Sequence, residues 1–322
     1  MKGLIDIDLT KLGLKNVRKG KVRTLGEFGD KFIAVTTDRL SAFNVVSTQA
    51  VPFKGQCLNA QSRYFFNECE NIIKPWAGTI SHPLLLIGEK LEIIPFEFIY
   101  RAILTGSLAD DYARGERGEV YGIKLPDNLK RNHFFEKPIF TPTRKSEFDE
   151  KISVDTMFEE AKSGKIQGKR IISPIIKEAI DVGFALFYRI QNLLNDKNLI
   201  LADCKLEFGI SSDSRLMWAD EAPTGDSARF FDRAEFEEAV AEGREPVQLS
   251  KEYLRQILKK MGWTGGTPVM PIFSEEEISE TSKRYLELTK LIRGKPVSKL
   301  DYDINQEEVI VSIISDYLGC IR

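Results

Sequence analysis

The sequence predicts an α+β fold with two lobes, because strand-like and helix-like segments occupy different parts of the chain. Residues 20–53 and 79–105 are β-rich, whereas residues 168–195 carry apolar side chains at the spacing of one long helix. We expect a small β-rich N-terminal lobe at residues 1–102 and a larger α+β lobe at residues 103–322. A cleft between two such lobes is a common place for a small ligand.

In the N-terminal lobe, "KVRTL" and "KFIAVTT" flank "GEFGD", which predicts a hairpin with a glycine-containing turn. "QCLNAQSRYFFNECENI" has apolar residues at helical spacing. "LEIIPFEFIYRAIL" predicts two strands interrupted at Pro95, because proline cannot donate to a strand ladder.

In the second lobe, Pro174 is compatible with the long helix only in its first turn. A β-hairpin at residues 201–219 follows this helix. Three further helices are expected near residues 249–261, 275–293 and 305–318.

The composition limits the classes of partner. The chain has 322 residues, 42% of them hydrophobic, and a net charge of −2, so no basic field marks it as a binder of nucleic acid or of anionic membranes. The longest apolar runs are too short to span a bilayer, and no signal peptide is evident. Four scattered cysteines and two histidines indicate neither a disulfide framework nor a zinc site. We expect a cytoplasmic protein that acts on small molecules.

The predicted hairpin carries the most informative pattern. In "LADCKLEFGI", residues 201–210, strand alternation places Asp203, Lys205 and Glu207 on one face and three apolar side chains on the other. A turn at "SSDS" that pairs position 210 with 215 would place Lys205 opposite Asp220, with Glu207 on the diagonal. A shift of one residue would turn Asp220 to the apolar face.

Glu207 and Asp220 could therefore converge on one cation. Two carboxylates beside a lysine are suited to a magnesium-bound polyphosphate. The alternative is an amphipathic edge hairpin whose charges are simply solvated. The apolar opposite face and the following "TGDSAR", with an Asp, a hydroxyl and an Arg, favour a site.

Two more segments could contact phosphate groups. Lys21 and Arg23 lie on one strand face beside the glycine hairpin and could neutralise a triphosphate, although an ordinary exposed hairpin has the same pattern. In "YRAILTGSLADDYARG", Ser107 is a candidate helix N-cap, and with Arg101 on the preceding strand it could also hold a phosphate monoester. One serine can serve both purposes.

Two loops add further candidates. "TTDRLSAFN" places Asp38 and Ser41 at a strand end, where a salt-bridged turn is the alternative. "PIFTPTRKSEFDE" places Lys145 and Asp149 on a loop marked by proline, where a solvated loop is the alternative.

Taken together, "GKVRTL", "TDRLSAFN", "KGQCLN", "YRAILTGS", "YGIKLP", "PIFTPT", "ADCKLEFG" and "DEAPTGDSAR" resemble the SAICAR synthetase (phosphoribosylaminoimidazole-succinocarboxamide synthase) family. They occur in the family's order and cover residues 18–295. The resemblance implies a small β-rich lobe, similar to a kinase N-lobe or an ATP-grasp lobe, over a larger α+β lobe, with ATP in the cleft between them.

The implied reaction joins L-aspartate to the carboxylate of 5-amino-1-(5-phosphoribosyl)imidazole-4-carboxylate (CAIR) at the expense of ATP, in de novo purine biosynthesis. Because a carboxylate is a poor electrophile, an acyl phosphate is the expected intermediate. The resemblance implies ATP and Mg²⁺ as cofactors and small molecules as partners; it leaves the oligomeric state open. The alternatives are a related amide ligase acting on another carboxylate or amine, and a nucleotide-binding regulatory module, which the absence of kinase HRD and DFG motifs disfavours.

Residue roles follow from the same motif match. Catalysis is assigned to Lys205, Asp226 and Asp149; cofactor binding to Lys21, Arg23, Lys205 and Glu207; substrate binding to Asp38, Ser41, Arg101, Ser107, Ser227 and Arg229; and metal binding to Glu207 and Asp220. Three positions depart from the family pattern: Asn44 replaces a frequent Asp, Phe148 a frequent His, and Ala228 a frequent Ser.

Overall fold

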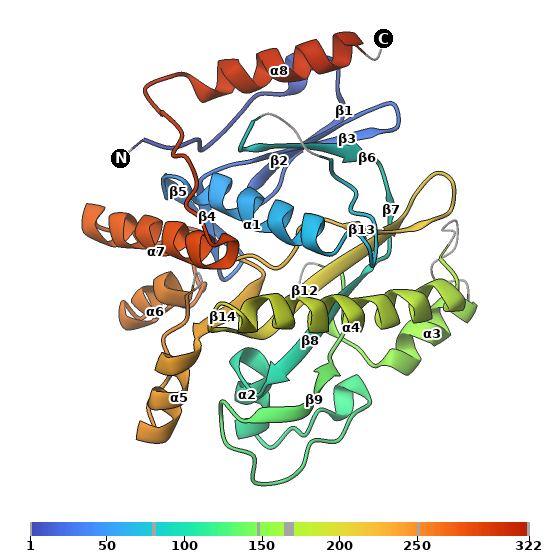
Figure 1. Ribbon diagram of the computed structural model, residues 1–322, viewed down its shortest axis with the longest axis vertical. Coiled ribbons are helices and arrows are strands. Elements are labelled where there is room, and N and C mark those ends of the chain that lie inside the picture. Colours follow the sequence, from blue (N-terminus) through green and yellow to red (C-terminus); the bar gives the residue numbers. More distant parts are fainter. Residues whose placement is uncertain (1, 79–81, 147–148, 164–170, 250–251, 321–322) are drawn as a thin grey trace.

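Two antiparallel sheets form the framework of the protein (Figure 1). The computed structural model describes residues 2–78, 82–146, 149–163, 171–249 and 252–320. The first sheet has four strands, in the order β1 (Lys15–Lys19), β2 (Arg23–Phe28), β3 (Lys31–Thr36) and β6 (Leu85–Glu89). The second sheet has eight strands: β7 (Glu92–Ile93), β8 (Phe96–Ile103), β9 (Phe134–Phe140), β10 (Thr143–Arg144), β11 (Glu150–Lys151), β12 (Leu199–Ile210), β13 (Leu216–Ala219) and β14 (Ala228–Asp232). A separate ribbon pairs β4 (Arg39–Ala42) with β5 (Val45–Ala50).

Helices cover these sheets. They are α1 (Lys54–Glu68), α2 (Gly106–Ala113), α3 (Val154–Ser163), α4 (Ser173–Asn195), α5 (Arg233–Glu242), α6 (Glu252–Lys260), α7 (Glu275–Arg293) and α8 (Gln306–Cys320). The three predicted C-terminal helices are confirmed as α6, α7 and α8, and the predicted N-terminal helix as α1. The long helix is confirmed as α4 with Pro174 in its first turn; part of its predicted start lies outside the described residues. The sequence patterns did not predict α3 and α5.

The glycine hairpin of the first sheet is confirmed. Phe28 pairs with Lys31 across a two-residue turn, and Gly29 has φ +58°. A left-handed residue is what a tight hairpin turn requires, and glycine adopts it without steric cost. The hairpin therefore brings the start of β2 and the end of β3 to one edge of the sheet.

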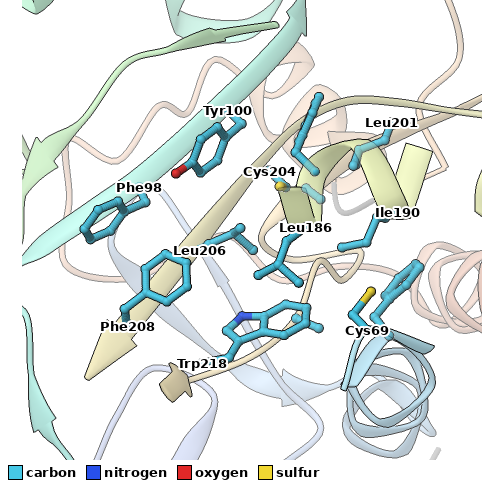
Figure 2. Close-up of a cluster of buried hydrophobic side chains, with 14 of the residues drawn as sticks. Cys69, Phe98, Tyr100, Leu186, Ile190, Leu201, Cys204, Leu206, Phe208 and Trp218 are labelled. Atoms are coloured by element: carbon cyan, nitrogen blue, oxygen red, sulfur yellow. The ribbon is translucent and has the colours of Figure 1, made fainter. Parts of the chain in front are cut away.

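The main core lies between α4 and the second sheet. Cys204, Leu206 and Phe208 project from one face of β12 and are fully buried. Figure 2 shows them in one cluster with Leu186 and Ile190 of α4. The predicted apolar face of this strand is thus confirmed, and its charged face is directed away from the core.

The C-terminal helix packs on the first sheet rather than on the second (Figure 1). Ile310, Ile314 and Leu318 of α8 are buried in one cluster with Ile33 and Val35 of β3. Residues at the two ends of the chain therefore build one layered unit. Within the described residues, no helix combines the length and apolar character needed to cross a bilayer.

Strand β8 of the second sheet contributes charged side chains beside those of β12. It spans the predicted lobe boundary at residue 102 and pairs along its length with β12, so that Asp203 lies opposite Arg101 and Lys205 opposite Ile99. Its polar side chains Glu97 and Arg101 are only 8% and 4% exposed. The centre of the second sheet is consequently the place where charged side chains from both strands meet.

Candidate active site

A cavity of about 700 Å³ lies between the two sheets. It is bounded by β2 and β3 on one side and by β8, β12 and β13 on the other. The predicted site residues that line it are Lys21, Arg23, Ser41, Asp149, Lys205, Glu207, Asp220, Asp226 and Ser227. Segments separated by 200 residues along the chain are therefore brought together at one concave surface, the usual form of a small-molecule site.

The register of the β12–β13 hairpin differs from the prediction by one residue. Ile210 pairs with Leu216 and Glu207 with Ala219, so Lys205 is not opposite Asp220. The turn is longer than expected because Ser211 closes it through its own side chain: the Ser211 hydroxyl accepts a hydrogen bond from Arg215 N at 3.0 Å.

Asp220 nevertheless reaches the cavity, because the strand ends before it. Its φ of +57° is left-handed and redirects the chain, and the Trp76 indole N–H donates to its carbonyl at 2.7 Å. The Asp220 carboxylate then lies 3.8 Å from Lys205 Nζ. The expected loss of Asp220 to the apolar face would apply only to a strand that continued in extended conformation.

Glu207 is the centre of an ion cluster at the cavity wall. Its carboxylate accepts from both Lys205 and Lys145, and its side chain is 3% exposed. Lys205 Nζ also lies 3.1 Å from Glu97 on β8. Burial alone would lower the pKa of Lys205, but the charges of Glu207, Asp220 and Glu97 outweigh it and raise the pKa well above its usual value. Lys205 is therefore a permanent cation at neutral pH.

Arg23 brings the first sheet into this cluster. It donates to Asp220, and its Nη2 lies 2.9 Å from Glu221 Oε2. Burial by itself would raise the pKa of Asp220, yet Arg23, Lys205 and Lys145 hold that pKa far below its usual range. Asp220 is thus ionised at neutral pH, as a metal ligand must be.

Two other carboxyl groups in the cavity behave differently. Burial raises the pKa of Glu221, against the opposing effect of Arg23. Desolvation also raises the pKa of Asp149, and the negative charge of Glu97 adds to the effect. Asp149 is consequently a better proton acceptor at neutral pH than an ordinary surface carboxylate.

The cavity also has apolar lining. Leu25 and Ala34 of the first sheet, Val22 just before β2, Trp76 and Ile93 all contribute to it. A flat heterocycle could be bound against such side chains while its charged part extends toward Lys21, Arg23 and Lys205. The cavity thus combines the apolar and cationic lining that a nucleotide requires.

A metal ion could be held where Glu207 and Asp220 line the cavity. Among the residues that the structure describes, no group of three histidine, cysteine or carboxylate side chains is arranged as a metal site. Glu207 and Asp220 are nevertheless two carboxylates beside one lysine, and Mg²⁺ is commonly bound by one or two carboxylates while phosphate oxygens and water fill its other positions. The pair fits Mg²⁺ that arrives with a polyphosphate.

A second cluster lies further along the charged face of β12. Arg101 and Arg229 both donate to Asp203 Oδ2, at 3.1 and 2.7 Å. Arg229 lies against the first turn of α2, since a Cβ on Gly106 would come within 2.4 Å of its guanidinium. Two arginines, one carboxylate and the amides of a helix N-terminus give this cluster a net positive charge.

Ser107 follows Gly106, the residue that lies beside Arg229, but it does not cap the helix. Helix α2 begins at Gly106, so its N-cap is Thr105, whose side chain makes no cap hydrogen bond, and Ser107 is the second helical residue. The helix thus starts two residues earlier than predicted, and Gly106 itself has φ +59°. The exposed Ser107 hydroxyl therefore remains available to a ligand at the helix N-terminus.

The "TGDSAR" segment joins the cavity to the second cluster. Asp226 Oδ2 accepts from Lys54 at 2.7 Å, and Ser227 Oγ accepts from Thr224 N at 3.1 Å. Ala228, one of the family departures, is buried opposite Cys204. Of the other departures, Asn44 lines the cavity and accepts from Lys21 Nζ at 2.8 Å, whereas Phe148 lies outside the described residues.

Asp38 lies away from both clusters. Its carboxylate is fully buried and accepts from Leu4 N at 2.8 Å, Gly55 N at 2.9 Å and the Tyr302 hydroxyl at 2.5 Å. These donors come from the N-terminal segment, α1 and the segment before α8. This placement supports a role in joining the chain ends to the core. Asp38, predicted to bind substrate, is not among the described residues that line the cavity.

We expect Asp38→Asn to lower the free energy of unfolding by about 1–3 kcal/mol, because an amide can accept on only one of its two polar atoms. The KM values for all substrates should remain unchanged. Urea unfolding together with steady-state kinetics checks this expectation. A large rise in a substrate KM at unchanged stability would instead return Asp38 to the binding site.

Sequence reasoning did not assign roles to Glu97 and Trp76. Glu97 could have been found by the pattern of charged residues on an apolar strand that marked β12. It shares its strand with one other charged residue, Arg101. Trp76 has no comparable signal: its contact with Asp220 joins residues 144 positions apart.

Fold and site together define an α+β enzyme with a cation- and carboxylate-lined cavity between two antiparallel sheets. The model of the SAICAR synthetase family matches residues 16–268. The chain belongs to this family, and it is a ligase that forms SAICAR in purine biosynthesis.

Relatives and solved structures agree with this assignment. The phosphoribosylaminoimidazole-succinocarboxamide synthases of Bacteroides thetaiotaomicron and Cytophaga hutchinsonii are 35% and 34% identical; the matches cover 94% and 92% of this chain and 94% and 93% of the relatives. The structure of SAICAR synthase from Saccharomyces cerevisiae in complex with SAICAR matches with a TM-score of 0.76 at 26% identity, covering 92% of this chain and 99% of that chain. A SAICAR synthetase in complex with ADP, 23% identical, has the same fold, with a TM-score of 0.64 over 88% of this chain and all of that chain.

Proposed function

We propose that the cavity between the two sheets is the site at which ATP drives the joining of L-aspartate to the carboxylate of CAIR. The carboxylate oxygen of CAIR attacks the γ-phosphorus, which forms an acyl phosphate and releases ADP. The aspartate amine then attacks the acyl carbon, forms the amide and expels phosphate, and the amine loses a proton. The observation that carries the proposal is the single charged face of β12, with the Lys205–Glu207 cluster at one end and the Arg101–Asp203–Arg229 cluster at the other.

In this proposal the nucleotide occupies the cavity between the two sheets. Its base lies between Val22 and Trp76, and its phosphates extend toward Lys21, Arg23 and Lys205. These cations neutralise charge that develops on the transferred phosphoryl group, which is the main source of rate enhancement in phosphoryl transfer. Arg23 would exchange part of its pairing with Asp220 and Glu221 for the phosphates.

Glu207 and Asp220 would hold Mg²⁺ together with phosphate oxygens. When bound, the ion supplies charge stabilisation to the phosphoryl group. Both carboxylates lie beside Lys205, so metal binding would redistribute the contacts of that lysine.

CAIR would extend along β12. Its phosphate is bound by Arg101, Arg229 and the α2 N-terminus with Ser107, and its carboxylate points toward Lys205. Asp203 and Glu207 are four positions apart, roughly 13 Å along an extended strand, which is comparable with the length of a ribotide. The spacing of the clusters thus suits a substrate with a phosphate at one end and a reacting carboxylate at the other.

The remaining polar side chains would position the acceptor groups. Ser41, Asp226 and Ser227 line the same cavity. Asp149, whose pKa is raised by desolvation, is suited to accept the proton of the aspartate amine.

The test is ADP release by the purified protein with Mg²⁺-ATP, CAIR and L-aspartate, with each component omitted in turn. We expect ADP release over many turnovers to require all components and SAICAR to accumulate in equal amount. ADP release over many turnovers that is independent of CAIR or of aspartate would overturn the proposed acceptor, and would instead support a related ligase with another carboxylate or amine.

A further inference from the structure

Helix α7 lies outside residues 16–268, the part of the chain that matches the family model, yet it contacts the proposed active site. It packs along α1 in the structure, and both helices are visible side by side in Figure 1. Its residue Tyr285 is 3% exposed. The contacts of this tyrosine connect an element of the C-terminal segment to the "TGDSAR" loop.

The Tyr285 hydroxyl donates to Asp226 Oδ1 at 2.5 Å. The other carboxylate oxygen accepts from Lys54 Nζ at 2.7 Å, and the side chains of Lys54 and Asp226 are 0% and 7% exposed. Asp226 is therefore held from both sides, by a cation on α1 and by a hydroxyl on α7. Two donors, one on each carboxylate oxygen, restrict the carboxylate to one orientation.

The same helix also restrains the backbone of the loop. A Cβ on Gly225 would lie 3.1 Å from the Tyr285 ring, so the loop passes directly against it. Gln61 of α1 accepts from Gly225 N at 2.9 Å and donates to Thr289 Oγ1 of α7 at 2.7 Å. Tyr285 thus contacts the segment that carries Asp226 directly, and Thr289, one turn further along α7, reaches it through Gln61.

We propose that Tyr285 is a positioning residue of the ligase, which orients the Asp226 carboxylate toward the acceptor substrates from outside residues 16–268. The inference rests on the proposed function of Asp226. Burial raises the pKa of Tyr285 well above its usual value, so the hydroxyl stays protonated and acts as a donor. Lys54 compensates the charge of Asp226, whereas Tyr285 determines its direction.

Tyr285→Phe tests the proposal because it removes the hydroxyl and keeps the ring against Gly225. We expect kcat/KM for CAIR and for L-aspartate to fall about tenfold or more, the effect of losing one hydrogen bond to a charged group, while the KM for ATP stays unchanged. The control is Tyr112→Phe, at a tyrosine that does not line the cavity; its hydroxyl donates to Pro126 O at 2.6 Å and accepts from Leu129 N at 2.9 Å. Both variants should lose thermal stability, but only Tyr285→Phe should lose activity.

A double-mutant cycle with Asp226→Asn separates positioning from a structural effect. If Tyr285 acts through Asp226, adding Tyr285→Phe to Asp226→Asn should cause no further loss. Additive losses, or kinetics of Tyr285→Phe equal to those of Tyr112→Phe, would overturn the role of Tyr285 while leaving that of Asp226 intact. Full activity of Asp226→Asn would overturn both, and identifies a failure of the proposed function itself.

Discussion

Glu207→Gln should lower kcat by about 10²- to 10³-fold, the effect of removing one preorganised charge from the reacting phosphoryl group. The substitution is nearly isosteric, and the amide oxygen can still accept from one lysine. It removes the charge that Lys205 and Lys145 share, together with one of the two proposed Mg²⁺ ligands. The Mg²⁺ concentration for half-maximal rate should therefore rise as well.

Steady-state kinetics over a range of Mg²⁺ concentrations measures both effects. Glu160→Gln is the control, because Glu160 of α3 is also buried and is ion-paired with Arg144 of β10, but does not line the cavity. The two variants should unfold at similar urea concentrations. If Glu207→Gln retained near-normal kcat at saturating Mg²⁺, the charged face of β12 would not be the reaction site.

The second large effect is expected for Arg229→Met, which should raise the KM for CAIR about 10- to 100-fold and leave the KM for ATP unchanged. Charge-assisted hydrogen bonds contribute about 1.5–3 kcal/mol each, and the guanidinium lies at the N-terminus of α2, where a phosphate is favoured. Arg229 is a better target than Arg101, because Arg101 is 5% exposed and also donates to Thr141 at 2.8 Å. Loss of Arg101 would disturb the sheet as well as the site.

Initial-rate measurements with each substrate varied in turn check this result. Arg233→Met is a suitable control, since Arg233 lies four residues further along the chain and donates to Asn195 at the protein surface. Equal changes in the KM values for CAIR and ATP would remove Arg229 from the phosphate site.

Much of the fold was predictable from local patterns. Apolar spacing predicted α1, α4, α6, α7 and α8, because a helix in a large domain must bury one side and its sequence records which side that is. Strand alternation predicted the two faces of β12 for the same reason. Alternation along a strand does not determine which residues pair across a hairpin. The prediction therefore paired position 210 with 215, whereas the structure pairs Ile210 with Leu216.

The amino-acid sequence by itself determined most of the helices, the two faces of β12, the order of the family motifs and thereby the class of ligase. Only the tertiary structure decided how the charged residues are divided between two clusters, that Asp38 joins the chain ends, and that α8 covers the first sheet. It also decided that Tyr285 contacts Asp226. The physical reason is that side-chain periodicity is a local property, whereas the Trp76–Asp220, Leu4–Asp38 and Tyr285–Asp226 contacts arise between distant segments that the packing of helices and sheets brings together.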